Sequence, residues 1–201
     1  MSMVLLVVAV WPAMASTGRR RDARDNGRGH DIKVIRHGHG AHRLRHTIET
    51  YKPWSTRAVR CKPNPCRAII DVYFTTDSER DDDYERVVQI YKHEGELRAS
   101  IHKYWYDDED CVHDPAALLC DSGSKYIGDA RVWRSNRSSV TFSLPRKKLR
   151  RRGNLKIYGW RATLFDRRKK PCRGSDNSSV FGSDYMCVDY APERTWVWHR
   201  L

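Results

Sequence analysis

The chain has 201 residues, with 38 Lys and Arg against 25 Asp and Glu, and a formal net charge of +13 at pH 7. A chain of this length buries roughly 70% of its unfolded surface, so a single domain with a real core is possible. After residue 15 the sequence contains no apolar run long enough to cross a bilayer as a helix, which excludes a helical membrane protein.

The first residues have the pattern of a secretory signal peptide. An unbroken apolar run covers residues 4–11 and is followed by Pro12 and a small-residue site at residues 13–15. We expect cleavage after Ala15 and therefore a secreted, extracellular protein. Residues 16–30 contain almost no apolar side chain and are expected to form a flexible basic leader before one domain over residues 31–201.

Apolar and polar residues alternate with a period of two through most of residues 31–201, which is typical of strands with one buried face. The pattern predicts strands at residues 31–37, 43–50, 68–75, 84–92, 97–104, 130–134, 138–144, 156–165 and 195–199. HGHGAH, at residues 37–42, indicates a turn, and the one helix candidate, residues 115–119, is about a single turn long. We therefore predict an all-β fold, an antiparallel β-sandwich of roughly eight to ten short strands.

Six cysteines suit an exported chain that meets an oxidising environment. Neighbouring cysteines enclose turn-rich segments, which favours sequential pairing among the 15 pairings that six cysteines allow. The expected loop disulfides are Cys61–Cys66, Cys111–Cys120 and Cys172–Cys187. Each would add about 2 to 4 kcal/mol. A structural zinc site is the alternative, but the chain lacks a CxxC pair.

Several short motifs follow one another in a recognisable order. They are DI-x-V at 31–34, R-L-x-x-T-I at 43–48, V-Y-F-x-T-D at 72–77, D-Y at 83–84, S-V-T-F-S-L-P at 139–145 and A-P-E-R at 191–194. In this order the chain resembles a group of uncharacterised exported bacterial β-sandwich proteins, themselves reminiscent of DOMON domains and family 9 carbohydrate-binding modules. The resemblance implies a sandwich that binds a sugar or another small ligand, and no set of ligand residues carries over from it.

Aromatic residues at outward strand positions indicate a binding surface. Alternation places four tyrosines opposite their apolar neighbours, where their rings can stack on sugars: Tyr73, Tyr91, Tyr104 and Tyr106. Strand propensity alone is the alternative explanation for tyrosines at these positions. Three tryptophans, Trp160, Trp196 and Trp198, are expected in the core.

Runs of Lys and Arg create a field that attracts anionic polymers. The longest run supplies six candidate ligand-binding residues: Arg146, Lys147, Lys148, Arg150, Arg151 and Arg152. Solvated loops are the alternative interpretation. No sequence motif for specific nucleic-acid recognition accompanies the runs.

Two groups of residues are candidate metal ligands. On a strand His37 and His39 would share a face in a histidine-rich region, and neutral imidazoles hold zinc or copper, with solvated histidines in a flexible turn as the alternative. Carboxylates that alternate along a hairpin connection can converge on Ca²⁺: Asp77, Glu79, Asp81 and Asp83. The sixth position of an EF-hand loop is Asp82 rather than Gly, so a solvated acidic turn is the alternative. Apart from this calcium, no cofactor is predicted.

The sequence favours a secreted, noncatalytic module that binds cell-envelope polysaccharide or another anionic surface polymer. Two alternatives stay open: a metal- or histidine-dependent hydrolase that uses His37 and His39, and a secreted protein-interaction or inhibitor domain. The sequence contains no Ser/His/Asp or Cys/His set with readable spacing, so an enzyme is the less favoured class. The oligomeric state stays open.

Overall fold

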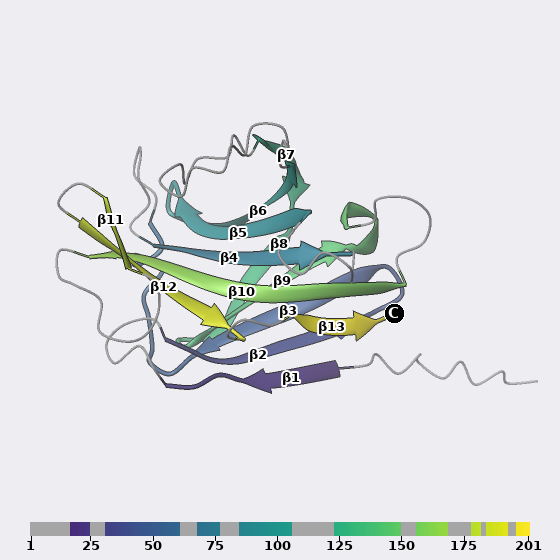
Figure 1. The fold of residues 1–201 in the computed structure, drawn as a ribbon, viewed down its shortest axis with the longest axis horizontal. Coiled ribbons are helices and arrows are strands. Elements are labelled where there is room, and N and C mark those ends of the chain that lie inside the picture. Colours follow the sequence, from purple (N-terminus) through teal and green to yellow (C-terminus); the bar gives the residue numbers. More distant parts are fainter. Residues whose placement is uncertain are drawn as a thin grey trace, which may run out of the picture.

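The computed structural model describes residues 17–24, 31–60, 68–76, 85–105, 123–149, 156–168, 178–181, 184–192 and 196–201. These residues form thirteen strands and one short 3-10 turn, η1 (Arg146–Lys148), and no α-helix occurs among them. The strands form two antiparallel sheets, one in front of the other in Figure 1. No helix in this described part of the chain has the length and apolar character needed to span a membrane.

The smaller sheet has five strands in the order β1-β2-β3-β9-β8. Their bounds are β1 (Thr17–Arg21), β2 (Ile32–His39), β3 (Arg43–Thr50), β9 (Ser139–Pro145) and β8 (Arg131–Asn136). A tight turn joins β2 to β3, in which the Gly40 amide donates to the Arg43 carbonyl over 2.9 Å. The first three strands therefore follow one another both along the chain and across the sheet.

The larger sheet has eight strands, seven of which follow the order β11-β12-β10-β4-β5-β6-β7. Their bounds are β11 (Ser178–Phe181), β12 (Asp184–Ala191), β10 (Ile157–Arg168), β4 (Ala68–Thr75), β5 (Arg86–His93), β6 (Glu96–Trp105) and β7 (Gly123–Asp129). The eighth, β13 (Val197–Arg200), pairs with the same edge of β10 as β12 does. Ala191 pairs with Ala162 and Val197 with Trp160, so β12 and β13 run along β10 one after the other.

The core lies between the two sheets and consists of every second residue of their strands. On β4, Ile70, Val72 and Phe74 are at most 1% exposed. The largest fully buried side chains include Trp160 on β10 and Phe142 on β9, one from each sheet. Burying an apolar side chain of this kind contributes roughly 1.5 to 3 kcal/mol, so the alternation predicted from the sequence is also what stabilises the sandwich.

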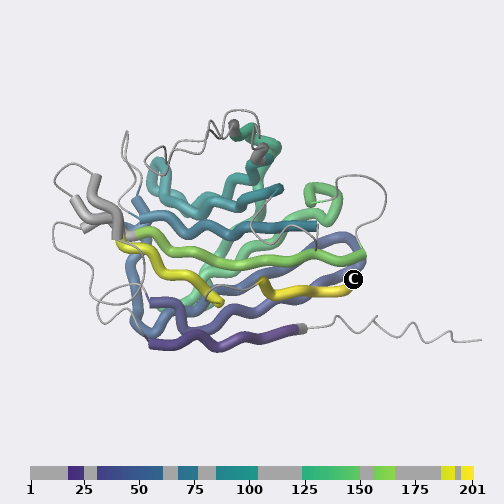
Figure 2. Tube along the Cα trace, in the orientation of Figure 1, coloured from purple at the N-terminus to yellow at the C-terminus, as the bar shows by residue number. Residues whose placement is uncertain are grey.

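Contacts at two edges join the sheets. On one side the chain passes from β7 to β8 through Ala130, whose amide donates to the Ala99 carbonyl over 2.8 Å. On the other side the Ile32 amide donates to Asp189 Oδ2 over 2.6 Å. Asp189 is fully buried, and this bond connects the N-terminal and C-terminal parts of the chain, which lie together in Figure 2.

The sequence-based prediction of an all-β sandwich is confirmed, and two strands have the predicted bounds, Arg43–Thr50 and Ala68–Thr75. Four strands were not predicted, β1, β7, β11 and β12, so the described residues form thirteen strands rather than the roughly eight to ten expected. The predicted turn at HGHGAH is shorter than expected, because β2 continues to His39. The expected helix at residues 115–119 and the expected signal peptide lie outside the described residues.

The flexible leader predicted for residues 16–30 is wrong for Thr17–Arg21, which form strand β1. This strand pairs antiparallel with β2, with Gly18 opposite His37 and Arg20 opposite Ile35. Pairing at a sheet edge uses backbone hydrogen bonds and does not require apolar side chains. The lack of apolar residues was therefore not evidence against a strand at this position.

Cys187 on β12 is the one cysteine in the described part of the chain. Its side chain is 2% exposed, and the described residues include no free thiol. The other five cysteines lie outside the described residues, so the three loop disulfides remain predictions.

Candidate ligand-binding face of the larger sheet

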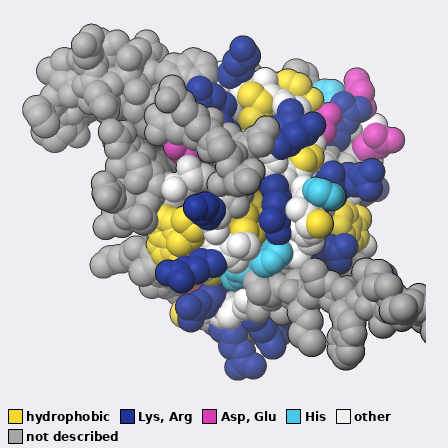
Figure 3. Space-filling view, turned by 90° about the vertical axis from the view of Figure 1, so that its right-hand side faces the viewer, with side chains coloured by type: hydrophobic (Ala, Val, Ile, Leu, Met, Phe, Trp, Pro, Cys, Tyr) yellow, Lys and Arg dark blue, Asp and Glu magenta, His cyan; other side chains and the backbone are white. Residues whose placement is uncertain are grey.

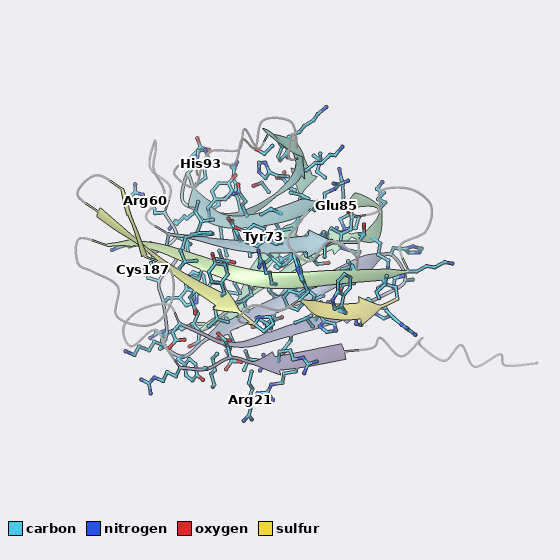
Figure 4. All side chains as sticks on the ribbon, viewed as in Figure 1. Arg21, Arg60, Tyr73, Glu85, His93 and Cys187 are labelled. Carbon is cyan, nitrogen blue, oxygen red and sulfur yellow. The ribbon has the colours of Figure 1, made fainter. Side chains whose placement is uncertain are left out.

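The outer face of the larger sheet carries the residues that alternate out of phase with the core. The strand register arranges them in rows across the sheet. The rows are Trp198–Gly159–Thr75, then Arg161–Tyr73–Val87–His102–Tyr126, then Tyr190–Thr163–Asp71–Gln89–Ser100–Asp129. Tyr73 is labelled near the middle of the sheet in Figure 4. Side chains far apart in the sequence therefore share one surface, which we call the outer face.

Trp198 lies over Gly159, its partner on β10. Two atoms of its six-membered ring, Cη2 and Cε2, are 3.2 and 3.3 Å from the position that a Cβ on Gly159 would occupy. The glycine thus leaves room for the indole to rest on the sheet, and Trp198 remains 36% exposed. The prediction that Trp198 belongs to the core is wrong, because Val197 and His199 take the inward positions of β13.

Trp196 is also outside the core, whereas Trp160 is fully buried within it. Trp196 is half-buried and is one of three rings around the guanidinium of Arg161. The Arg161 Cζ lies 5.0 Å from the centroid of Trp196, 5.6 Å from that of Tyr73 and 5.8 Å from that of Tyr190. Contacts of this length are favourable cation–π interactions, and together they hold the guanidinium in one place.

Three polar atoms on the outer face are buried and have no hydrogen-bond partner. They are Asp71 Oδ1, Thr163 Oγ1 and Arg161 Nε. Asp71 and Thr163 face each other across β4 and β10, and Arg161 belongs to the neighbouring row. Buried polar atoms are nearly always hydrogen-bonded in folded proteins, so unpaired ones that cluster together indicate a place where a ligand or water binds.

The Asp71 carboxyl also has partners. Its Oδ2 accepts a long hydrogen bond, 3.5 Å, from the Tyr73 hydroxyl, and the Gln89 side chain also hydrogen-bonds to the carboxyl. Burial raises the pKa of Asp71 to about 7, against the lowering effect of Gln89 and Tyr73. Near neutral pH this carboxyl is therefore present both as an acid that can donate and as a carboxylate that accepts.

Of the four predicted stacking tyrosines, the structure describes two side chains. Tyr73 and Tyr91 are both half-buried and alternate out of phase with the core residues of their strands, as predicted. Tyr73 is the one that contacts Arg161. The side chain of Tyr104 and all of Tyr106 lie outside the described residues.

The predicted basic residues are only partly available as a charged surface. Lys147 is exposed, but Lys148 Nζ donates to the Ile127 carbonyl, and the Lys148 carbonyl accepts from Arg86 Nε over 3.1 Å. Lys148 is therefore part of the packing between η1 and β7. Arg150, Arg151 and Arg152 lie outside the described residues. Lys and Arg side chains are nevertheless spread over the end of the molecule seen in Figure 3.

A second cluster lies inside the sandwich and contains the predicted His37 and His39. The structure adds His46 from β3 and His199 from β13. His39 Nδ1 is 2.6 Å from His199 Nε2, and the rings of His37 and His199 are 4.2 Å apart. His46 is fully buried, with its ring 4.2 Å from that of Trp160. The sequence offered no signal for His199, because it joins the cluster only through the facing sheet.

Burial lowers the pKa of every histidine in this cluster. The pKa of His37 falls to about 4, mainly through burial and then through His199, His39 and Arg20. The pKa of His46 falls well below its usual value for the same main reason. These imidazoles are therefore neutral at pH 7.

The metal sites predicted from the sequence gain no support here. Among the described residues, no group of three His, Cys, Asp or Glu side chains is arranged to hold a metal ion. The calcium candidates Asp77, Glu79, Asp81 and Asp83 lie outside the described residues, so that site remains a prediction.

Two of the buried polar atoms without partners, His46 Nδ1 and Trp160 Nε1, belong to the histidine cluster rather than to the outer face. Both side chains are fully buried between the two sheets. On the outer face Asp71 and Thr163 are also buried, but Arg161, Tyr73 and Trp198 in the neighbouring rows keep contact with solvent. The outer face is therefore the better candidate for a binding site.

Comparison with known proteins finds no relative of the chain. Protein-family models, curated proteins and solved structures were each compared with the chain, and none of them matches it.

Proposed function

We propose that this chain is a noncatalytic, secreted module that binds a saccharide of the cell envelope on the outer face of its larger sheet. The observation that carries the proposal is the set of three unpaired buried polar atoms, on Asp71, Thr163 and Arg161, beside a group of aromatic rings. The apolar start of the sequence and its even number of cysteines support the secreted setting.

A saccharide suits this combination of groups. A sugar ring has an apolar face of C–H groups that packs on an aromatic ring, and a rim of hydroxyls that needs hydrogen bonds. Trp198 offers a partly exposed indole that rests on the sheet. Asp71 and Thr163, two rows along the outer face from Trp198, carry unpaired oxygen atoms that suit hydroxyls. Residues two rows apart on one face are about 13 Å apart, so stacking and hydrogen bonding can act on successive sugars of one saccharide.

Replacing Trp198 with Ala is expected to weaken saccharide binding about tenfold, because the stacking surface is lost. Binding would be measured by retention of the purified protein on cell-wall polysaccharide and then by calorimetry with the soluble oligosaccharides released from it. The Tyr73→Ala variant is expected to behave in the same way, since Tyr73 borders the same site.

Trp133→Ala is the matched control. Trp133 is 37% exposed, close to the 36% of Trp198, but it lies on β8 in the smaller sheet. We expect this variant to bind as the parent protein does. The proposal would be contradicted if Trp198→Ala and Trp133→Ala lost the same amount of saccharide affinity. It would also be contradicted if the parent protein were not retained on any envelope polysaccharide.

A further inference from the structure

Arg161 has no carboxylate partner in the described part of the chain. The ion pairs among these residues lie elsewhere, at Glu49 and Glu94. The Nε of Arg161 is buried without a hydrogen bond, and the guanidinium is bordered by three rings rather than by an acid. A half-buried cation held in this way has donor capacity that the described residues do not use.

The geometry of a guanidinium determines which ligand can use that capacity. Its planar N–H groups bind carboxylates, sulfates and phosphates through two parallel hydrogen bonds, and such charge-assisted bonds are roughly twice as strong as neutral ones. The three rings fix the orientation of Arg161 before any ligand arrives, so little side-chain freedom is lost on binding. An anionic oxygen pair is therefore the group that fits Arg161 best.

The charges around Arg161 do not oppose an anion. The nearest acid in the rows of the outer face is Asp71, which sits diagonally from Arg161 in the strand register. Burial holds the pKa of Asp71 near 7, so this acid is protonated for much of the time at neutral pH. The chain as a whole carries a formal net charge of +13, which attracts anionic polymers over a distance.

We propose that the saccharide bound by the outer face is acidic, with its carboxylate or sulfate group held by Arg161 while a sugar ring stacks on Trp198. This inference rests on the proposed function and specifies its ligand class. It assigns to Arg161 the selection of anionic over neutral sugars, and to the aromatic rings the binding that both kinds of sugar share.

Two matched pairs of probes test the inference by calorimetry at one fixed ionic strength. The first pair is oligogalacturonate and its fully methyl-esterified form, which differ in the carboxylate charge. The second pair is dextran sulfate and dextran, which differ in the sulfate. We expect the acidic member of at least one pair to bind about tenfold or more tightly than its neutral counterpart, and the pair concerned identifies the anionic group.

Arg161→Ala is expected to remove this preference, because the affinity for the acidic probe falls to that for the neutral probe. Arg161→Lys is expected to restore only part of the preference, because an ammonium cannot make the two parallel bonds. The control is Arg45→Ala. Arg45 lies 5.5 Å from the Trp133 ring centroid on the smaller sheet and reproduces an arginine beside a tryptophan away from the site.

The possible failures are distinguishable. If acidic and neutral probes bind equally, and Trp198→Ala weakens both, the outer face binds saccharides but the assignment to Arg161 is wrong. If Arg45→Ala reduces acidic binding as much as Arg161→Ala does, the preference comes from general charge and the inference is also wrong. If none of the four probes binds while the parent protein is retained on cell-wall polysaccharide, this inference fails and the proposed function stands; if the protein is not retained on any envelope polysaccharide either, both fail.

Discussion

Acidification from about pH 7 to about pH 4 is expected to lower the free energy of unfolding by about 2 kcal/mol or more through the histidine cluster. The folded state depresses the pKa of His37 from 6.5 to about 4, and it depresses that of the fully buried His46 further. Between these pH values the two histidines bind more protons in the unfolded chain than in the folded chain. Stability is therefore fully present above pH 6.5 and is lost as the pH falls toward 4.

The positive groups around the cluster increase this effect. Arg20 lies close enough to His37, and Arg146 close enough to His39 and His199, to lower the pKa values of these histidines. Another titratable neighbour is Tyr158, whose hydroxyl lies 3.4 Å from His46 Nε2 and whose pKa burial raises well above its usual value. No carboxylate among the described residues is close enough to affect the pKa of His37 or His46, so nothing offsets the charge that protonation creates.

Asp71, whose pKa burial raises to about 7, changes stability in the opposite direction over this range. The histidine contribution is therefore measured by urea unfolding between pH 4 and pH 8 as the difference between the parent protein and histidine variants. His46→Phe should reduce the acid-induced loss, because the ring at this position already stacks on Phe142, with centroids 5.2 Å apart. His37→Gln is a second variant, useful if the first does not fold. His42→Gln is the control, since His42 is exposed. The same acid-induced loss in all three variants would show that the cluster is not responsible.

Trp160→Ala is expected to lower the free energy of unfolding by about 3 to 5 kcal/mol, as large-to-small substitutions of buried aromatic residues do. Trp160 is fully buried and contacts the rings of His37 and His46 from the opposite sheet. The cavity would therefore lie where the two sheets meet. Denaturant unfolding at pH 7 gives the value directly.

Trp133→Ala provides the comparison, because an exposed tryptophan on β8 should change stability by no more than about 0.5 kcal/mol. If the two substitutions had similar effects, Trp160 would not be the central residue of the core. Trp198→Ala is expected to resemble Trp133→Ala in stability, while differing from it in saccharide binding.

Alternation was sufficient to predict strands that bury one face. The segment AIIDVYFT has apolar residues at every second position, and it forms β4 with the predicted bounds. The same rule, applied strictly at the C-terminus, would have placed Trp198 outward, since Val197 and His199 take the two inward positions. The wrong prediction for Trp198 came from treating tryptophan as a core residue whatever its phase in the strand.

Other features depend on pairing that the sequence does not display. Strand β1 is polar, and its position comes from backbone bonding to β2. The candidate site brings Tyr73 next to Arg161 through the register of β4 with β10, across 88 positions of sequence. Sequence alone identified Tyr73 as outward, but it gave no reason to select Arg161 from the many other arginines.

The most direct test of the account is an NMR titration of the tryptophan indole N–H signals with the tightest-binding acidic oligosaccharide. If the outer face is the binding site, the signals of Trp196 and Trp198 will shift, and those of Trp133 on the opposite sheet and Trp160 in the core will not. A shift of the Trp133 signal with unchanged Trp196 and Trp198 signals would place the ligand on the smaller sheet and contradict the account.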